Sequence, residues 1–274
     1  MTLSFSTANG TAVSTSDYTA QTVAVTMTAA STADINVTNT IVAGDLIAEP
    51  TETFTGTISM TTANSQQYVI DTPTATSTIN DNDVITINLA GFTVTETDGT
   101  QVQNFVASMN HAAQYDLVLS FSTTDGTGLD GNDYIAQTAT VVTMLAGTTS
   151  VNIPVNILGD LICEPQEAFT GTITLTNANS QQASVGTATA IGTINDNDPA
   201  TLAISGFTKN EADGTGTYTI TLSRDVQNAF TVEFATSDIT ALAASDYTAI
   251  GTTTMIFGAA NPLVQTITVT INDD

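Results

Sequence analysis

The chain repeats itself, and this internal repetition restricts its fold more than any other feature of the sequence. The stretch LSFSTANGTAVSTSDYTAQT at residues 3–22 matches LSFSTTDGTGLDGNDYIAQT at 119–138, and both match VEFATSDITALAASDYTAIG at 232–251. A second pair follows, EPTETFTGTISMTTANSQQ at 49–67 and EPQEAFTGTITLTNANSQQ at 164–182. The copies recur about every 115 residues, so we expect a tandem array of similar domains.

The three copies differ in how much of the repeat they contain. We predict a repeat lacking its first strand at residues 1–83, a complete repeat at 84–198, and a repeat lacking its C-terminal strands at 199–274. Incomplete sandwiches leave backbone groups unpaired and cores open. We therefore expect this chain to be a segment of a longer array. The alternative is strand exchange between chains in a filament.

Each copy has the pattern of an all-β domain. In SVNIPVNIL, the residues Val151, Ile153, Val155 and Ile157 fall on one face of a strand, and AFTGTITLTN alternates in the same way. Turn signals such as NGT, DGT and DGN separate the runs. About seven short strands per repeat predict an antiparallel immunoglobulin-like sandwich. Short junctions between the copies predict an extended array of such sandwiches.

The charge of the chain is almost entirely negative. Lys and Arg together number 2 against 27 Asp and Glu, which gives a formal net charge of -25. Phosphate groups are bound by Lys and Arg, so we expect neither nucleic acid nor an anionic membrane surface as a partner. No apolar run approaches the roughly 18 residues of a membrane span, so we expect no membrane insertion by this segment. Met1 leads directly into a strand-like segment, and any secretion signal would lie upstream in a longer parent.

The acidic side chains gather at strand ends and in loops, whereas the strands are almost uncharged. In the middle copy they occupy VTETDGT, NDY, ILGD, CEPQEAF and NDND. The loops of a sandwich cluster at its two ends, and two carboxylates about 4 Å apart repel by roughly 4 kcal/mol at an effective dielectric of about 20. The internal cations Lys209 and Arg224 lie outside this set. Either these acids therefore stay apart in solvent, or a hard divalent cation lies among them at one end of the sandwich, and Ca²⁺ suits carboxylate and carbonyl oxygens best.

Together, these motifs resemble a known family. The succession SFSTxxGT, DY, an alternating strand that ends in Asp, ExxEAF and TINDND is similar to the Calx-β domain over essentially the whole chain. The resemblance implies that calcium binds at one end of each sandwich. Carried over residue by residue, it predicts these metal ligands: Asp17, Asp45, Glu49, Glu52, Asp81 and Asp83 in the first copy; Glu96, Asp133, Asp160, Glu164, Glu167, Asp196 and Asp198 in the middle copy; and Glu211, Asp246, Asp273 and Asp274 in the third.

The sequence departs from the family pattern at four positions. Gly44 and Gly159 replace the first member of an Asp pair, and Asn82 and Asn197 interrupt the terminal Asp run. Fewer charges predict fewer or weaker ions in each copy. We expect the third site, which lacks most of its ligands, to bind poorly.

Simpler structural roles compete with metal binding for several residues. Asn and Asp satisfy their own backbone in turns, so NDND could be a turn alone, and the Asp of each DY could cap a strand beside a packing Tyr. We expect His111 to be an exposed loop residue and Cys163 to be a small, partly buried one. With a single His, a single Cys and no nucleophile elbow, a catalytic triad has no support, and we predict that the chain is not an enzyme.

These features predict a calcium-binding stalk segment of a long secreted adhesin or filament on a bacterial cell surface. Calcium would stiffen the junctions between neighbouring repeats. The partners would be the neighbouring repeats of the same chain, and the whole protein could grip a host or environmental surface. Two alternatives stay open, a ligand-binding adhesion module and a regulatory calcium sensor.

Overall fold

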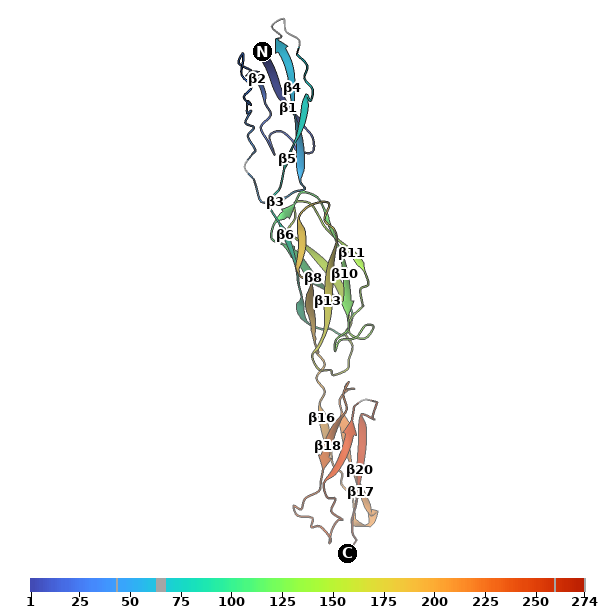
Figure 1. The fold of residues 1–274 in the computed structure, drawn as a ribbon. Helices are drawn as coiled ribbons and strands as arrows, with labels where there is room; N and C mark the ends of the chain where they lie inside the picture. The colour runs from blue at the N-terminus through green and yellow to red at the C-terminus, as the bar shows by residue number, and fades with distance from the viewer. Residues whose placement is uncertain (43, 63–67, 259, 274) are drawn as a thin grey trace.

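The protein is an elongated row of three β units, with the N-terminus at one end and the C-terminus at the other (Figure 1). This computed structural model describes residues 1–42, 44–62, 68–258 and 260–273. Within these ranges the one helix is the short 3-10 turn η1 at Glu211–Asp213, and no helix has the length and hydropathy that a membrane crossing needs. The predicted all-β class is confirmed.

The middle repeat is a sandwich of two sheets, as predicted. One sheet has the strand order β11-β10-β13-β15-β7, and the other has the order β12-β8-β6-β14. The strands of the sandwich are β6 (Ile85–Ala90), β7 (Phe92–Thr95), β8 (Gln101–Met109), β10 (Leu117–Thr124), β11 (Thr140–Met144), β12 (Ser150–Ile157), β13 (Glu167–Asn177), β14 (Ala183–Thr187) and β15 (Thr189–Asn195).

The sandwich has more strands than the expected number of about seven, because two strands are each divided between the sheets. Gly91 separates β6 from β7, and an added Cβ there would overlap the carbonyl oxygen of Ile191. At the other end of the repeat, Ala188 separates β14 from β15. The parts of the two divided strands pair with each other in parallel, β14 with β6 in one sheet and β15 with β7 in the other. The other strand pairs of the sandwich are antiparallel.

The core of the middle repeat lies between its two sheets. Along β13, Phe169, Gly171 and Ile173 face inward and are buried, while the threonines between them face outward. A Cβ on Gly171 would come within 2.8 Å of the Phe105 ring and 2.9 Å of the Phe121 ring. The glycine therefore makes room for two buried aromatic side chains.

The outer repeats have smaller cores among the described residues. The first repeat has the sheet β2-β1-β4-β5, and the third has the sheets β16-β17-β20 and β18-β19. Their strands are β1 (Thr2–Asn9), β2 (Thr22–Thr26), β4 (Glu52–Thr62), β5 (Thr74–Ile79), β16 (Leu202–Ser205), β17 (Thr215–Leu222), β18 (Phe230–Phe234), β19 (Thr253–Phe257) and β20 (Val264–Thr270). Their buried clusters are Ala12, Tyr18 and Phe54 in the first repeat, and Ile220, Leu222, Phe234 and Phe257 in the third.

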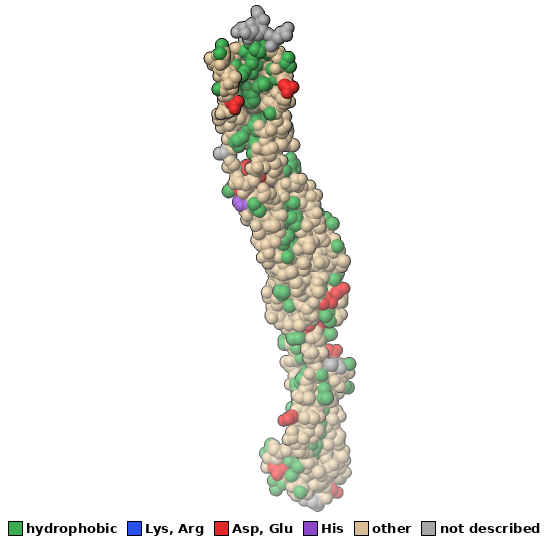
Figure 2. Space-filling view, in the orientation of Figure 1, with side chains coloured by type: hydrophobic (Ala, Val, Ile, Leu, Met, Phe, Trp, Pro, Cys, Tyr) green, Lys and Arg blue, Asp and Glu red, His purple; other side chains and the backbone are tan. Residues whose placement is uncertain are grey.

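Neutral polar side chains and backbone together cover most of the face drawn in Figure 2, with scattered acids and apolar patches. The first two repeats are joined by two very short strands, β3 (Ile47–Ala48) and β9 (Ala112–Ala113), which pair in parallel across the junction. This small element brings a loop of the middle repeat against the acidic end of the first.

Candidate metal centre

The Asp-Tyr pair of each repeat belongs to a turn that the Asp carboxylate closes. In the middle repeat, Asp133 Oδ2 accepts a hydrogen bond from Leu129 N at 2.6 Å, so the carboxylate closes its own turn. Tyr134 stacks on Phe169 with ring centroids 3.9 Å apart, and its hydroxyl donates to Asp125 Oδ1 at 2.6 Å. The buried ring therefore fixes the position of the carboxylate beside it.

The same turn recurs in the other repeats. Asp17 Oδ2 accepts from Val13 N at 2.5 Å, and Asp246 Oδ2 accepts from Leu242 N at 2.6 Å. Tyr18 stacks on a phenylalanine of the first repeat as Tyr134 does in the middle one. The Asp of each pair therefore closes a turn, and in the first two repeats it also presents a carboxylate oxygen to neighbouring acids, so its role as a metal ligand stays a prediction.

Two groups of acids meet at the end of the middle repeat that faces the third. The linker group is Glu96, Asp196 and Asp198, and the loop group is Asp133, Glu164 and Glu167. Within each group, one carboxylate oxygen of every residue lies within 4.8 Å of the others. The charges of Asp133 and Asp196 both act on Glu164, so the two groups adjoin. We call this end of a repeat its acidic pole.

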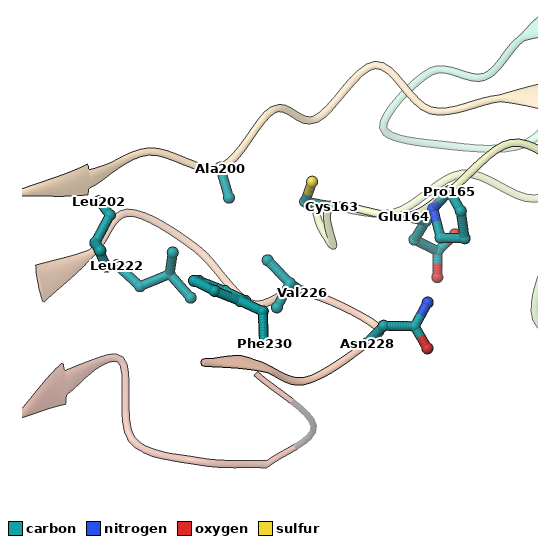
Figure 3. A pocket seen from close by; sticks show the side chains of 9 residues that line it. All are labelled: Cys163, Glu164, Pro165, Ala200, Leu202, Leu222, Val226, Asn228 and Phe230. Carbon is teal, nitrogen blue, oxygen red and sulfur yellow. The ribbon is translucent and has the colours of Figure 1, made fainter. Parts of the chain in front are cut away.

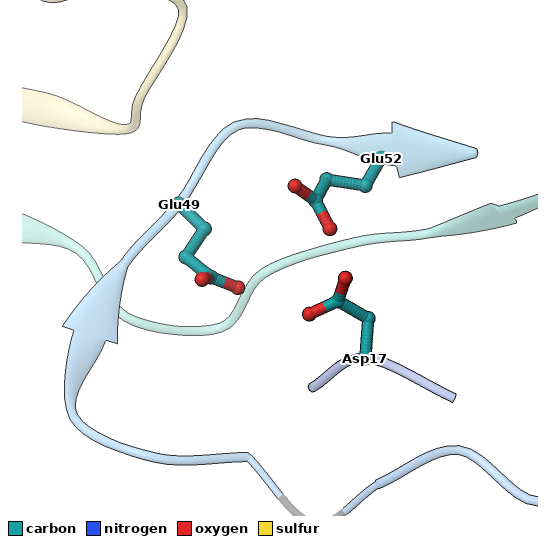
Figure 4. A group of neighbouring side chains, drawn as sticks. All are labelled: Asp17, Glu49 and Glu52. Atoms are coloured by element: carbon teal, nitrogen blue, oxygen red, sulfur yellow. The ribbon is translucent and has the colours of Figure 1, made fainter. Parts of the chain in front are cut away.

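The first repeat has a matching group at its own acidic pole. Asp17, Glu49 and Glu52 satisfy the same 4.8 Å criterion, and Figure 4 shows their carboxylates directed toward a shared space. They hold the places that Asp133, Glu164 and Glu167 hold in the middle repeat. Carboxylates from separate turns thus come together in both repeats, and their binding of an ion stays a prediction.

Burial and mutual repulsion disfavour the charged forms of these glutamates. Burial, followed by the charge of Glu164, raises the pKa of Glu96 to about 7. Burial also raises the pKa of Glu164 and that of Glu167 to about 7. In the first repeat, burial and the charge of Asp17 raise the pKa of Glu52 to about 7. A bound cation would relieve this repulsion.

The linker group fits a hard divalent cation. Glu96 Oε1 and Asp198 Oδ2 are buried without a hydrogen-bond partner, and each of the two residues is only 4% exposed. An unpaired buried carboxylate oxygen is costly. A ligand set made only of oxygens suits Ca²⁺.

Polar groups of the third repeat reach the acidic pole of the middle repeat, which the sequence reasoning missed. Arg224 forms an ion pair with Asp198, so the expectation that both internal cations lie apart from the acids is wrong. Gln227 Nε2 donates to Glu167 Oε1 at 2.8 Å and to Glu164 Oε1 at 3.2 Å. The middle repeat therefore shares its pole with its neighbour.

The first junction shows corresponding contacts. Gln114 Nε2 donates to Glu49 Oε1 at 2.9 Å. His111 Nδ1 lies 3.9 Å from Asp83 Oδ1, and the His111 side chain is only 26% exposed, so the prediction of an exposed histidine is wrong. A signal for these residues exists in the sequence, since Gln114 and Gln227 hold the same place when residues 119–138 are aligned with 232–251.

The remaining predicted ligands of the first two repeats lie beside the groups. Asp45 and Asp160 close tight turns, each accepting a hydrogen bond from the backbone N–H two residues further on. Asp81 accepts from Glu49 N at 3.1 Å. An Asp in place of Gly159 would have no room, because a Cβ there would overlap the carbonyl oxygen of Thr97.

The predicted acids of the third repeat do not form a group in the part of it that the structure describes. Glu211 begins the turn η1, Asp246 closes its Asp-Tyr turn, and Asp273 is exposed. Asp274 lies outside the described residues. Poor calcium binding by this repeat stays a prediction.

Fold and site define the chain as a tandem of β domains, and the acidic poles of the first two suit a hard divalent cation. The model of one family, the Calx-beta domain, matches residues 1–83, 79–198 and 200–274. The chain belongs to the Calx-beta family, and the predicted resemblance is confirmed. Calx-beta domains are calcium-binding, and the three acid groups are the places that could hold the ion.

Several solved structures are similar to parts of the chain. The apo form of the Calx CBD1 domain is 16% identical, with a match that covers 42% of this chain and 100% of that one at a TM-score of 0.36. The CBD12 structure from CALX1.2 is 17% identical over 69% of this chain and 75% of that one, at a TM-score of 0.36. Native alpha-2-macroglobulin of E. coli is 8% identical over 80% of this chain and 17% of that one, at a TM-score of 0.29. No curated protein matches the chain.

Proposed function

We propose that this chain is a non-enzymatic stalk segment of a long secreted adhesin on a bacterial cell surface, and that calcium stiffens the junctions between its repeats. One observation carries the proposal. The acidic pole of the middle repeat faces a junction, and the third repeat touches it through Arg224 and Gln227. An ion held at such a pole acts on two repeats at once.

The two acid groups of the middle repeat have distinct roles in this proposal. The linker group would hold an ion beside the connection to the next repeat. The loop group would hold an ion beside the loop of the third repeat that contacts it. When bound, calcium supplies the positive charge that neutralises the carboxylates. Its binding stabilises the folded repeat by about 2.7 kcal/mol per site at 100 times the Kd.

The surface and the repetition support a secreted, extended protein. Only 2 Lys and Arg residues occur in 274, and the polar surface consists mostly of neutral side chains. Extracellular calcium modules work with Kd values on the order of 10⁻⁴ to 10⁻³ M, so even weak sites fill outside a cell. The partners proposed for this segment are its neighbouring repeats, while the whole protein grips a host or environmental surface.

Small-angle X-ray scattering tests the stiffening directly. We expect the maximum dimension of the chain to increase, and its spread of conformations to narrow, when calcium replaces a chelator. Magnesium at the same concentration is the control, because it retains its waters and prefers fewer protein ligands. Equal scattering profiles with calcium and with chelator would refute the stiffening.

Calorimetry and labelling separate the stalk from the alternatives. Calcium binding near extracellular concentrations favours the stalk, whereas micromolar affinity with a conformational change favours a sensor. Binding of the isolated segment to glycans or cells favours an adhesion module. Antibody labelling of intact cells that produce the parent protein tests the surface location.

A further inference from the structure

The two junctions are built from the same backbone contact. At the first junction Ala48 lies opposite Ala113 in the parallel pairing of β3 with β9. At the second junction Cys163 forms a parallel bridge with Val226. Ala48 and Cys163 hold the same place in successive copies, and so do Ala113 and Val226. The joint is therefore one repeated structure.

A glutamine follows this bridge in both repeats and is bound through its backbone and its side chain. Gln114 N donates to the carbonyl of Ala48 at 2.9 Å, and Gln227 N donates to that of Cys163 at 3.0 Å. The side-chain amides donate to glutamates of the preceding pole, Gln114 to Glu49 and Gln227 to the Glu164–Glu167 pair. The backbone hydrogen bond thus positions each glutamine side-chain amide next to the glutamates of the preceding pole.

A basic side chain precedes the bridge in both repeats. Arg224 pairs with Asp198 at the second junction, and His111 lies beside Asp83 at the first. Asp83 and Asp198 are the last residues of the two NDND segments, and both are buried. The loops at 111–114 and 224–227 therefore each present a basic group and, three residues later, an amide. In both junctions the basic group meets the last Asp of the NDND segment, and the amide meets a pole glutamate of the preceding repeat.

Apolar packing does little to orient the second junction. A pocket of about 440 Å³ remains open there, lined by Leu222, Val226 and Phe230 of the third repeat beside Cys163 and Glu164 of the middle repeat (Figure 3). A close-packed interface would fill this space. The backbone bridge, the ion pair of Arg224 and the hydrogen bonds of Gln227 are the directional contacts of this junction.

We propose that the loops at 111–114 and 224–227 are docking elements, through which each repeat recognises the acidic pole of the repeat before it, with the terminal glutamine as the specificity residue. The partner that they fit is another Calx-beta repeat with Glu-Pro-x-Glu at its pole. A glutamine amide has two N–H donors and no charge, so it can bind a glutamate pair where a carboxylate would be repelled. This docking needs no ion, so it goes beyond the proposed function.

The test measures the distance between two repeats of the full chain in chelator. Spin labels are placed at Asn152 and Thr254, which are exposed on different repeats, after Cys163→Ser removes the natural thiol. For the parent chain we expect electron double resonance to give a distribution with one main peak, at the docked distance, which calcium narrows further. In Gln227→Ala, loss of hydrogen bonds to charged groups should shift the docked equilibrium by about tenfold to a hundredfold, which broadens the distribution.

Two further variants make the result specific. Gln166→Ala is the matched control, because Gln166 belongs to the same pole but donates within its own repeat, to Asn195 Oδ1 at 2.7 Å, and its distribution should stay narrow. Gln227→Glu keeps the size of the side chain and should broaden the distribution further by adding a carboxylate to the loop group. If either Gln227 variant fails to fold, Gln227→Asn provides the same test with a shorter amide.

A narrow distribution in Gln227→Ala and Gln227→Glu alike would overturn the proposal, and so would equal broadening in Gln166→Ala. Addition of calcium to the parent chain tests the stiffening separately. Docking without stiffening is recognised by a narrow distribution in chelator that calcium leaves unchanged. Failure of the docking proposal and failure of the stalk proposal therefore give different results.

Discussion

Each buried glutamate of the acidic pole responds to protons and to cations through the same oxygens. The pKa values of Glu96, Glu164 and Glu167 are raised to about 7, above the ordinary value of 4.5. Between these two values the folded repeat holds more protons than the unfolded chain does. Without calcium, stability is therefore greatest at low pH, and the free energy of unfolding decreases as pH rises from 4.5 to about 7.

Calcium should remove this decrease, because the bound ion keeps the carboxylates deprotonated in the folded repeat, as they already are in the unfolded chain above about pH 5. In saturating calcium we expect the melting temperature to stay nearly constant over this interval. Scanning calorimetry from about pH 5 to pH 8 should therefore give a falling curve in chelator and a nearly level curve in calcium. A melting temperature that rises with pH in chelator would contradict the raised glutamate pKa values.

Substitution of one ligand should separate repulsion from metal binding. In chelator, Glu167→Gln should raise the melting temperature, since a neutral amide removes the repulsion with Asp133. Its calcium affinity should fall by about tenfold or more, because loss of a direct ligand costs at least as much as loss of an outer-shell partner. Calcium titration calorimetry checks the affinity. Glu233→Gln, at an exposed glutamate of the third repeat, should change neither quantity.

The acids of the site could be predicted from the sequence, but their neutral and basic neighbours could not. Repeated carboxylates at strand ends stand out in an almost uncharged chain, and sandwich loops converge. Gln227 carries no charge, so its signal in the sequence is only that it recurs at the place of Gln114, and its role depends on the following repeat reaching back to the pole. His111 was misjudged for the same reason, because its partner Asp83 belongs to the preceding repeat.

At the scale of the element, β13 depends on a glycine for its place in the core. Gly171→Ala should lower the free energy of unfolding by about 1–3 kcal/mol, the usual cost of overpacking a close-packed core. The added methyl group would press on the rings of Phe105 and Phe121. Denaturant unfolding checks this value. Gly99→Ala is the control, because a Cβ there meets nothing within 4 Å, and a comparable loss in that variant would contradict the explanation.

The alternating strands could be predicted well, whereas their division between sheets could not. Alternation fixes which residues of β13 face the core, and the structure agrees. The same pattern cannot show that β6 ends at Ala90 and β7 begins at Phe92 in the other sheet, because that change depends on the close approach of Gly91 to Ile191. The parallel edge pairings follow from this division.

At the scale of the molecule, the acids that lie close together in the described residues do so where the repeats meet. The formal net charge is -25, yet the three acid groups lie at poles and not along the strands. In two of the repeats the pole is contacted by the next repeat in the row. An ion bound at a pole should therefore affect a junction more than it affects the body of a sandwich.

Hydrogen exchange on the whole chain tests whether calcium acts mainly at the junctions. On adding calcium we expect slower exchange in the loops at 45–52 and 160–167, and in the docking loops that contact them. The Asp246 turn of the third repeat should serve as an internal control, because its Asp-Tyr turn has the same geometry but no acid group forms around it among the described residues. Strands β8 and β13, already protected by the core, should change little. Equal gains in protection at the Asp246 turn and at 160–167 would mean that calcium acts through general charge screening and not through the poles.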